Sequence, residues 1–200
     1  TPGVATLIVD MLLGVGGRGF YSQFGTTQSA SSRLLAEAAG TTVADTVFDP
    51  ACGIGGTLLA LARAHDVAIV GADIAPTVVD VAKLQAQLSG VSADFQCRDS
   101  LAHAASSSRQ RYRTVVVEAP LDQQANAGYC QNLARSFDDN IMVPARAHEA
   151  FLLCALRHLT SDGYGYVLTS FSPGVSHQSA ELRRLLLRRR QVEAIIQLPE

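Results

Sequence analysis

The feature that most constrains the fold is the run from Val47 to Leu59, which reads VFDPACGIGGTLL. It joins an apolar strand, an acidic residue at the end of that strand (Asp49), a glycine-rich turn and the apolar start of a helix. Glycine adopts the backbone angles of a tight turn and lets a ligand approach the main chain closely. At the carboxyl end of a parallel strand, such a turn builds a nucleotide-type pocket at the switch point of an α/β sheet.

The spacing of the glycines distinguishes between ligands. A dinucleotide fingerprint requires G-x-G-x-x-G, whereas Gly53, Gly55 and Gly56 give G-x-G-G, with Asp49 four residues ahead. A carboxylate at that place favours a ligand that offers a cation or a hydrogen-bond donor. This requirement suits the ammonium group of S-adenosylmethionine better than a pyrophosphate. We therefore expect the methyl donor and keep a dinucleotide as the remote alternative.

Two further acidic residues end strand-like runs. Asp73 closes the run AIVGAD, and Asp99 follows the strand expected at 93–97. An acid at the end of the second strand of such folds accepts hydrogen bonds from ribose hydroxyls, which is the role we expect for Asp73. Asp99 is a candidate acceptor for the adenine amino group, although a lone Asp at this place is often only a helix cap. Together with Asp49, they favour one shared ligand site.

Strand-like and helical patterns alternate along the chain, which predicts a doubly wound, mostly parallel α/β sheet. The expected strands are 43–49, 67–73, 93–97, 113–118, 164–169 and 192–198. The expected helices lie near 28–39, 56–64, 75–88, 146–159 and 178–190.

The remaining segments define the domain limits and the loops. Residues 1–13 are mildly amphipathic and predict a helix, which a glycine linker follows, so we divide the chain into 1–19 and a domain over 20–200. Residues 102–111 indicate a solvated loop or helix end. The longest irregular stretch, 122–144, either gates a pocket or is a disordered insertion, because loops of that length are usually functional or mobile.

The run DPACGIGGTL resembles the donor-binding motif of the amino-group DNA methyltransferases. The most similar group is the adenine-N6 methylase that forms the modification subunit of type I restriction systems. Further matches run collinearly over about residues 20 to 200. They are Gln23-Phe24-Gly-Thr26-Thr27 for "F-x-T-P" (without its proline), Gly71-Ala-Asp73-Ile74 for "G-x-E-I", Asp99-Ser100-Leu for "G-D-S-L", Ala150-Phe151 to Gly163 for "A-F-x-x-H-x-L-x-x-x-G", and Glu181-Leu-Arg with Val192 to Pro199 for "I-R-x-x-L … V-x-A-V-I-x-L-P".

The resemblance implies the class I S-adenosylmethionine-dependent methyltransferase fold, which is Rossmann-like, with S-adenosylmethionine as cofactor. It also implies DNA as a partner, together with a separate specificity subunit or self-association. The residues that it assigns to the donor site are Phe24, Thr26, Asp49, Pro50, Ala51, Cys52, Gly53, Gly55, Gly56, Asp73, Ile74, Asp99 and Ser100. That fold has a seventh, antiparallel strand between strands five and six. The sequence ends just after the expected sixth strand, so we expect that strand to be missing.

The chain departs from the family where the chemistry belongs. The family carries Asn-Pro-Pro-Phe after its fourth strand, and this chain carries Glu118, Ala119, Pro120 and Leu121. In the family, the Asn side chain and the first Pro carbonyl accept hydrogen bonds from the target amino group, and the aromatic ring stacks on the flipped base. Glu118 is one methylene longer and charged, and Leu121 cannot stack as an aromatic ring does. We therefore expect these four catalytic positions to be degenerate and methyl transfer to be impaired.

Two other functions stay open beside an impaired DNA methylase. One is a donor-binding relative that no longer transfers methyl groups and serves assembly or regulation. The other is a small-molecule methyltransferase that uses Glu118 as a general base. A cytosine-C5 enzyme is disfavoured, because its mechanism needs a cysteine nucleophile after the fourth strand. The four positions there, 118–121 (the tetrad), contain no cysteine, and Cys52 lies inside the glycine turn instead.

Composition narrows the class of protein. The chain of 200 residues is 48% hydrophobic and 17% charged, which is typical of one globular domain, and its net charge of −2 gives no overall attraction to nucleic acid. The four scattered cysteines indicate neither a metal site nor disulfides, and no run is apolar enough for a membrane helix, so we expect a reduced, cytoplasmic protein. Five arginines lie on one expected helix, where they either form a solvated face or contact phosphates. They are Arg183, Arg184, Arg188, Arg189 and Arg190.

Overall fold

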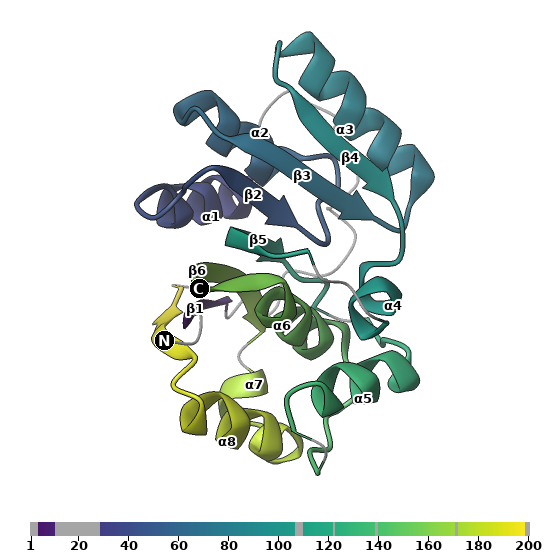
Figure 1. Ribbon diagram of the computed structural model, residues 1–200, viewed down its shortest axis with the longest axis vertical. Coiled ribbons are helices and arrows are strands. Elements are labelled where there is room, and N and C mark those ends of the chain that lie inside the picture. Colours follow the sequence, from purple (N-terminus) through teal and green to yellow (C-terminus); the bar gives the residue numbers. More distant parts are fainter. Residues whose placement is uncertain are drawn as a thin grey trace.

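The computed structural model describes residues 4–10, 29–106, 110–121, 123–138, 140–170 and 172–198. Its strands are β1 (Val4–Asp10), β2 (Thr46–Asp49), β3 (Ala68–Asp73), β4 (Ala93–Cys97), β5 (Tyr112–Glu118), β6 (Leu159–Ser170) and β7 (Val192–Gln197). They form one sheet in the order β4-β3-β2-β5-β6-β1-β7, and each ladder between neighbours is parallel (Figure 1). The doubly wound parallel sheet is therefore confirmed.

Helices cover both faces of this sheet. The helices are α1 (Ala30–Gly40), α2 (Gly56–Ala64), α3 (Pro76–Leu88), α4 (Ser100–Ala105), α5 (Ala127–Arg135), α6 (Ala147–His158), α7 (Ser172–Val175) and α8 (Ala180–Arg188), and a 3-10 turn, η1, spans His177–Ser179. Buried side chains of α1, α2 and α3 form one apolar cluster, and those of α4, α5, α6 and α8 form the other. The two clusters make the three-layer arrangement of a doubly wound fold.

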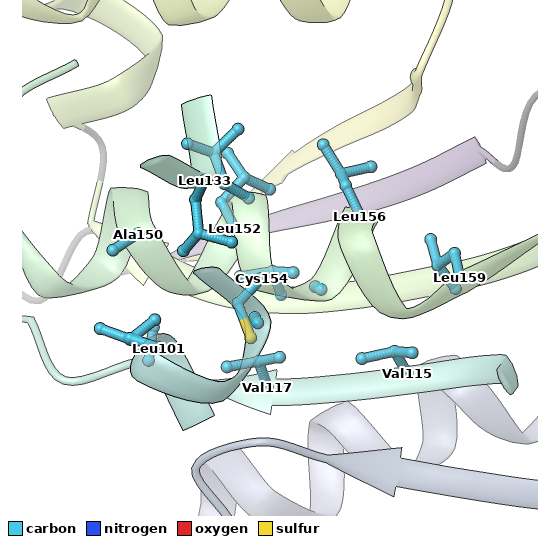
Figure 2. Packing of buried hydrophobic residues seen from close by; sticks show 14 of the residues in the cluster. Leu101, Val115, Val117, Leu133, Ala150, Leu152, Cys154, Leu156 and Leu159 are labelled. Atoms are coloured by element: carbon cyan, nitrogen blue, oxygen red, sulfur yellow. The ribbon is translucent and has the colours of Figure 1, made fainter. Parts of the chain in front are cut away.

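The central strand β5 shows why the sequence folds this way. Val115 and Val117 belong to the cluster with α6, whereas Val116 belongs to the cluster with α1 and α2. Successive side chains of a strand point to opposite faces, so a strand covered on both sides needs apolar residues at every position. Figure 2 shows Cys154 of α6 directed toward Val117 of β5 in the first of these layers.

One expectation for the N-terminus was wrong. Residues 4–10, expected in a helix, form β1, which pairs with β6 from Val4 to Asp10 and with β7 on its other side. The segment VATLIVD is rich in β-branched residues, which fit a pleated surface better than a helix. β1 also occupies the place between the fifth and sixth core strands that we expected to be missing a strand, and it runs parallel instead of antiparallel. The expected glycine linker lies outside the described residues.

The stretch 122–144 was expected to be irregular, but it contains α5. This helix begins after Asn126, whose side-chain oxygen accepts a hydrogen bond from the Tyr129 amide, and it buries Cys130 and Leu133. Gly, Tyr and Asn are weak helix formers, so local propensity did not indicate the helix, and burial against α4 and α6 stabilises it. The flanking segments form an antiparallel bridge between Gln124 and Arg146.

His158, at the end of α6, is a buried titratable group that the donor site does not use. Its side chain is 1% exposed, it lies 4.9 Å from the Phe48 ring, and its Nδ1 donates to the Cys154 carbonyl at 2.8 Å. Burial lowers the pKa of His158 from 6.5 to about 4, with nearby arginines adding to the shift and the hydrogen bond to Cys154 opposing it. The native protein therefore holds this imidazole in its neutral form.

We predict that this histidine makes the fold sensitive to mild acid. Because the unfolded state takes up the proton at a higher pH than the folded state, stability falls as the pH drops from 6.5 toward 4 and is unaffected above that window. Between pH 7 and pH 5 the loss is about 2 kcal/mol. Urea unfolding of wild type and His158→Phe at both pH values measures it. The variant should lose that part of the pH dependence, and the exposed control His177→Gln should keep it; equal dependence in all three would contradict the assignment.

Candidate functional site

The sheet has its switch point between β2 and β5. From β2 the chain proceeds outward through β3 to β4, and it then returns to the other side of β2 with β5. In open α/β sheets, ligands bind in the crevice at the carboxyl ends of the strands at such a point. Figure 1 shows β2 and β5 side by side. Asp49 ends β2 and Glu118 ends β5, so the two acids lie at adjacent strand ends, where such a crevice is expected.

The glycine turn after β2 is held in place and open on one side. Gly53 and Gly55 have positive φ angles of 53° and 85°, which favour glycine. Among the described residues, a Cβ atom built on Gly53 would meet no heavy atom within 4 Å, whereas one on Gly55 would lie 2.9 Å from the Phe95 ring. Gly55 is therefore needed for packing, and Gly53 presents bare backbone to free space. Pro50 and Ala51 complete the turn, and the Ala51 amide donates to Asp49 at 2.8 Å.

Asp49 is a buried carboxyl group in an acidic environment. Its side chain is 2% exposed. Burial raises the pKa of Asp49 well above 3.8, repulsion from Glu118 and Asp73 adds to the rise, and the hydrogen bond from the Ala51 amide opposes it. The two side-chain charges that act on this carboxyl are thus both negative. A cationic ligand in the crevice would relieve that cost.

Asp73, at the end of β3, connects the two turns of the site. Its Oδ2 accepts a hydrogen bond from the Gly53 amide at 3.0 Å, and its Oδ1 accepts one from the Ala75 amide at 3.0 Å. A carboxylate offers about four acceptor positions, so these bonds leave capacity for a ligand. The neighbouring Ile74 is an apolar side chain that is 69% exposed. An acceptor and an exposed apolar side chain thus lie next to each other beside the turn.

Asp99 takes the role that was given as the alternative, a helix cap. Its Oδ1 accepts hydrogen bonds from the amides of Leu101 and Ala102, both at 3.0 Å, at the start of α4. Ser100 follows it and is buried, and its Oγ has no hydrogen-bond partner among the described residues. Contact of either residue with an adenine ring stays a prediction.

Glu118 is held by the first turn of α1. Its Oε1 accepts a hydrogen bond from the Ser31 hydroxyl at 2.6 Å, and its Oε2 accepts one from Ser32 at 3.1 Å. Ser29 caps the helix by accepting the Ser32 amide, and its hydroxyl donates to the Ser32 hydroxyl at 2.8 Å. We did not predict this serine clasp (Ser31 and Ser32) from the sequence. The run SASS indicates a helix start, but it does not identify the carboxylate that the hydroxyls bind.

The rest of the tetrad is fixed by its backbone. The Ala119 amide donates to the Leu168 carbonyl at 3.1 Å, which extends β5 along β6, and Pro120 follows. The Leu121 carbonyl accepts a hydrogen bond from Nδ1 of His148 at 3.0 Å, and Nε2 of this buried histidine lies 3.3 Å from the Ser170 hydroxyl. His148 was also missed, because nothing in its local sequence distinguishes it from the other histidines.

The remaining candidate residues give a mixed result. Phe24 and Thr26 lie outside the described residues. Cys52 is buried in the turn, where burial raises the pKa of its thiol, and all four cysteines are free. Among the described residues, no group of three or more His, Cys, Asp or Glu side chains is placed to hold a metal ion. In that same part of the chain, no helix combines the length and apolar character that crossing a bilayer requires.

The arginine cluster lies away from the site. α8 ends at Arg188, from where the chain enters the amino end of β7, so Arg188, Arg189 and Arg190 lie at the end of the sheet opposite the carboxyl ends of the strands. Arg184 pairs with Glu181, and the Arg189 guanidinium lies 5.7 Å from the Phe137 ring centre and donates to the Phe137 carbonyl. The cluster therefore does not contribute to the crevice.

Comparison with known proteins identifies a family and a shared fold. A family model described as N-6 DNA Methylase matches residues 21–200. A modification subunit of a putative type I restriction enzyme from Vibrio vulnificus superposes with a TM-score of 0.66 at 18% identity, covering 85% of this chain and 39% of its own. The type I methyltransferase subunit from Streptococcus thermophilus gives 0.66 at 20% identity, with 82% and 38% covered. A putative class I S-adenosylmethionine-dependent methyltransferase from Listeria monocytogenes gives 0.61 at 16%, with 80% and 50% covered.

These structures share the fold with this chain. The chain spans about two-fifths of the length of the two modification subunits. No curated protein matches it significantly.

We predict that ionised Asp49 costs stability. A carboxyl whose folded pKa is raised contributes stability below its unfolded pKa, and this contribution is lost as the pH rises through the folded value. At pH 7, Asp49→Asn should therefore raise the urea midpoint, because an amide keeps the acceptor for Ala51 and removes the buried charge. The gain should shrink as the pH falls toward 3.8, because the folded carboxyl is then neutral and the unfolded carboxyl also begins to take up protons.

Urea unfolding of Asp49→Asn at pH 7 and at pH 4 measures this effect. The matched control is Asp45→Asn, which makes the same change at an exposed position. A midpoint for Asp49→Asn that is lower than wild type at neutral pH would mean that the carboxylate stabilises the fold, and it would contradict the prediction.

Proposed function

Because the chain belongs to the N-6 DNA methylase family, we propose that its crevice binds S-adenosylmethionine and that the domain is a DNA adenine-N6 methyltransferase-like module with an impaired transfer step. Family membership and the fold support S-adenosylmethionine as the cofactor. One observation carries the proposal: bare backbone at Gly53, which no described residue covers, lies beside the buried Asp49 at the switch point of the sheet.

The proposed roles follow from the chemistry of each group. Asp49 would bind the donor's ammonium, which offsets the cost of its buried charge. Asp73 would accept from the ribose hydroxyls, and Ile74 would pack against the adenine ring, with Asp99 and Ser100 at the ring's edge. The backbone of the turn from Pro50 to Gly56 would form the floor of the site. The bound donor supplies an electrophilic methyl group on a cationic sulfur.

The residues at positions 118–121 support an impaired methyl-transfer step. Glu118 stands where the family has Asn, and both of its oxygens accept hydrogen bonds from the serine clasp. Leu121 cannot stack on a base, and base stacking on an aromatic ring is worth roughly 1–3 kcal/mol. Ala119 lacks the fixed φ of proline, which would hold its carbonyl rigid. An acceptor amino group would thus be held more weakly and less accurately than catalysis requires.

The substrate and partners of the whole protein are proposals on the same basis. DNA with a flipped adenine is the proposed acceptor, and a separate specificity subunit or a second copy would supply further DNA contacts, in a cytoplasmic setting. The serine clasp favours a second candidate, a donor-binding relative that no longer transfers methyl groups. A small-molecule methyltransferase with Glu118 as general base is a third candidate, because the serine clasp orients this carboxylate and leaves it further acceptor positions.

We predict donor binding that depends on Asp49. Calorimetric titration of S-adenosylmethionine into the intact protein should give a micromolar Kd, and Asp49→Asn should weaken it at least tenfold, which is about 1.4 kcal/mol. The exposed Asp45→Asn, which makes the same change before β2, should bind as wild type does. If wild type shows no binding, the crevice is scaffold only and the proposal fails.

We predict that restoring the tetrad raises transfer. Glu118→Asn with Leu121→Phe reintroduces a neutral acceptor and a stacking ring at the end of β5. Incorporation of labelled methyl groups into duplex DNA should rise at least tenfold over wild type in the double variant. Leu121→Phe alone is the matched control, because it restores stacking while Glu118 stays in the clasp. Unchanged incorporation in the double variant, with donor binding retained, would favour the relative without transfer activity.

A further inference from the structure

Two acidic side chains flank the crevice on adjacent strands. Asp49 ends β2 and Glu118 ends β5, and these strands pair directly through Val47 with Thr114 and Phe48 with Val115. Charge repulsion between the two carboxylates contributes to the raised pKa of Asp49. Two acids at the switch point, with bare backbone between β2 and its helix, define a site that prefers a cation.

The serine clasp decides where the charge of Glu118 lies. A glutamate at a strand end would normally extend into water, where solvent screens it. Here the hydroxyls of Ser31 and Ser32 hold both oxygens against the first turn of α1, so the carboxylate stays beside the crevice and only partly exposed. A preorganised charge acts on a ligand without the entropic cost of being ordered on binding.

The clasp is itself anchored on both sides. The Ser29 hydroxyl donates to Ser32, and Ser29 also caps α1. A Cβ atom on Gly56 would lie 3.1 Å from the Ser32 hydroxyl, so the absence of a side chain at the start of α2 leaves room for that serine. The same glycine-rich turn that opens the donor site thus also accommodates the group that positions Glu118.

We propose that Glu118 makes this site selective for charge at sulfur, so that it holds the cationic sulfonium donor and releases the neutral thioether, S-adenosylhomocysteine. The inference rests on the proposed donor binding. Donor and thioether share their ammonium, carboxylate, ribose and adenine groups, so the hydrogen bonds of Asp49 and Asp73 to these groups serve both ligands. They differ in one methyl group and one positive charge, and a fixed carboxylate across the crevice from the turn distinguishes them by that charge.

The size of the effect follows from Coulomb attraction. Two unit charges several ångströms apart in a partly buried site change a binding constant on the order of tenfold or more. A neutral side chain at position 118 would lack this attraction. A domain with Glu118 would therefore report the presence of unreacted donor, and the thioether would compete weakly for its site.

The test is the ratio of two dissociation constants. Calorimetry on the intact protein gives the Kd of S-adenosylmethionine and of S-adenosylhomocysteine for wild type and for Glu118→Gln. The glutamine keeps the length and acceptor oxygen and removes the charge, so the preference for the donor should fall on the order of tenfold, mainly through weaker donor binding. The matched control is Glu37→Gln on the exposed side of α1, which should leave the ratio unchanged.

A second variant keeps the inference testable if Glu118→Gln does not fold. Ser31→Ala with Ser32→Ala retains the charge but removes the clasp, so the preference should fall by a smaller factor, and raising the salt concentration should reduce it further. An unchanged ratio in Glu118→Gln, with both ligands still bound, would overturn the inference and leave donor binding intact. Absence of binding by wild type would instead overturn the proposed function, and this inference with it.

Discussion

The site depends on the docking of the glycine turn against β3. A Cβ atom on Gly71 of β3 would lie 2.6 Å from the Phe95 ring and 2.9 Å from Cβ of Cys52, so only glycine leaves room for the turn here. The Cys52 amide can therefore donate to the Ala72 carbonyl at 3.0 Å, and the Gly53 amide to Asp73. These two hydrogen bonds fix the turn that presents bare backbone at Gly53. A larger residue at position 71 would displace the turn, and with it the open side of the crevice.

The same arrangement concentrates negative charge where the fold gains nothing from it. Asp49 is buried, and the acids at the ends of β3 and β5 act on it unfavourably. A carboxylate that is costly in the free protein gains most from a ligand that carries positive charge, which is how binding sites commonly trade stability for affinity. Glu118 adds to that charge, and the serine clasp holds it in place instead of neutralising it. The departure from the family at this position thus changes the electrostatics of the proposed donor site as well as the proposed site of methyl transfer.

Most of the sheet and the glycine turn after β2 could be predicted from local sequence. Residues 93–97 alternate between apolar and polar side chains, and the strand that ends at Asp49 is a short apolar run before a glycine-rich turn, so both segments favour strands. β1 was missed because the amphipathic pattern of residues 1–13 was interpreted as a helix, although the β-branched residues of the segment favour the strand that pairs with β6 and β7. α5 was missed for a related reason, since its stability comes from packing of Cys130 and Leu133.

The serine clasp is a part of the site that could not be predicted from the sequence. Ser31 and Ser32 lie 87 and 86 residues from Glu118 in sequence, and hydroxyl and carboxyl groups carry no periodicity that links them. The hydrogen bond from His148 to the Leu121 carbonyl likewise joins residues that are far apart in sequence. Asp99 illustrates the reverse case, because the sequence allowed both a cap and a ligand contact, and the observed geometry is that of the cap.

The most direct test of donor binding in the crevice is a crystal structure of the intact protein grown with S-adenosylmethionine. We expect the donor at the carboxyl edge between β2 and β5, lying across Gly53, with its ammonium within hydrogen-bond distance of Asp49 and its ribose hydroxyls within reach of Asp73. A donor bound elsewhere on the protein, with the crevice empty, would contradict the proposed site.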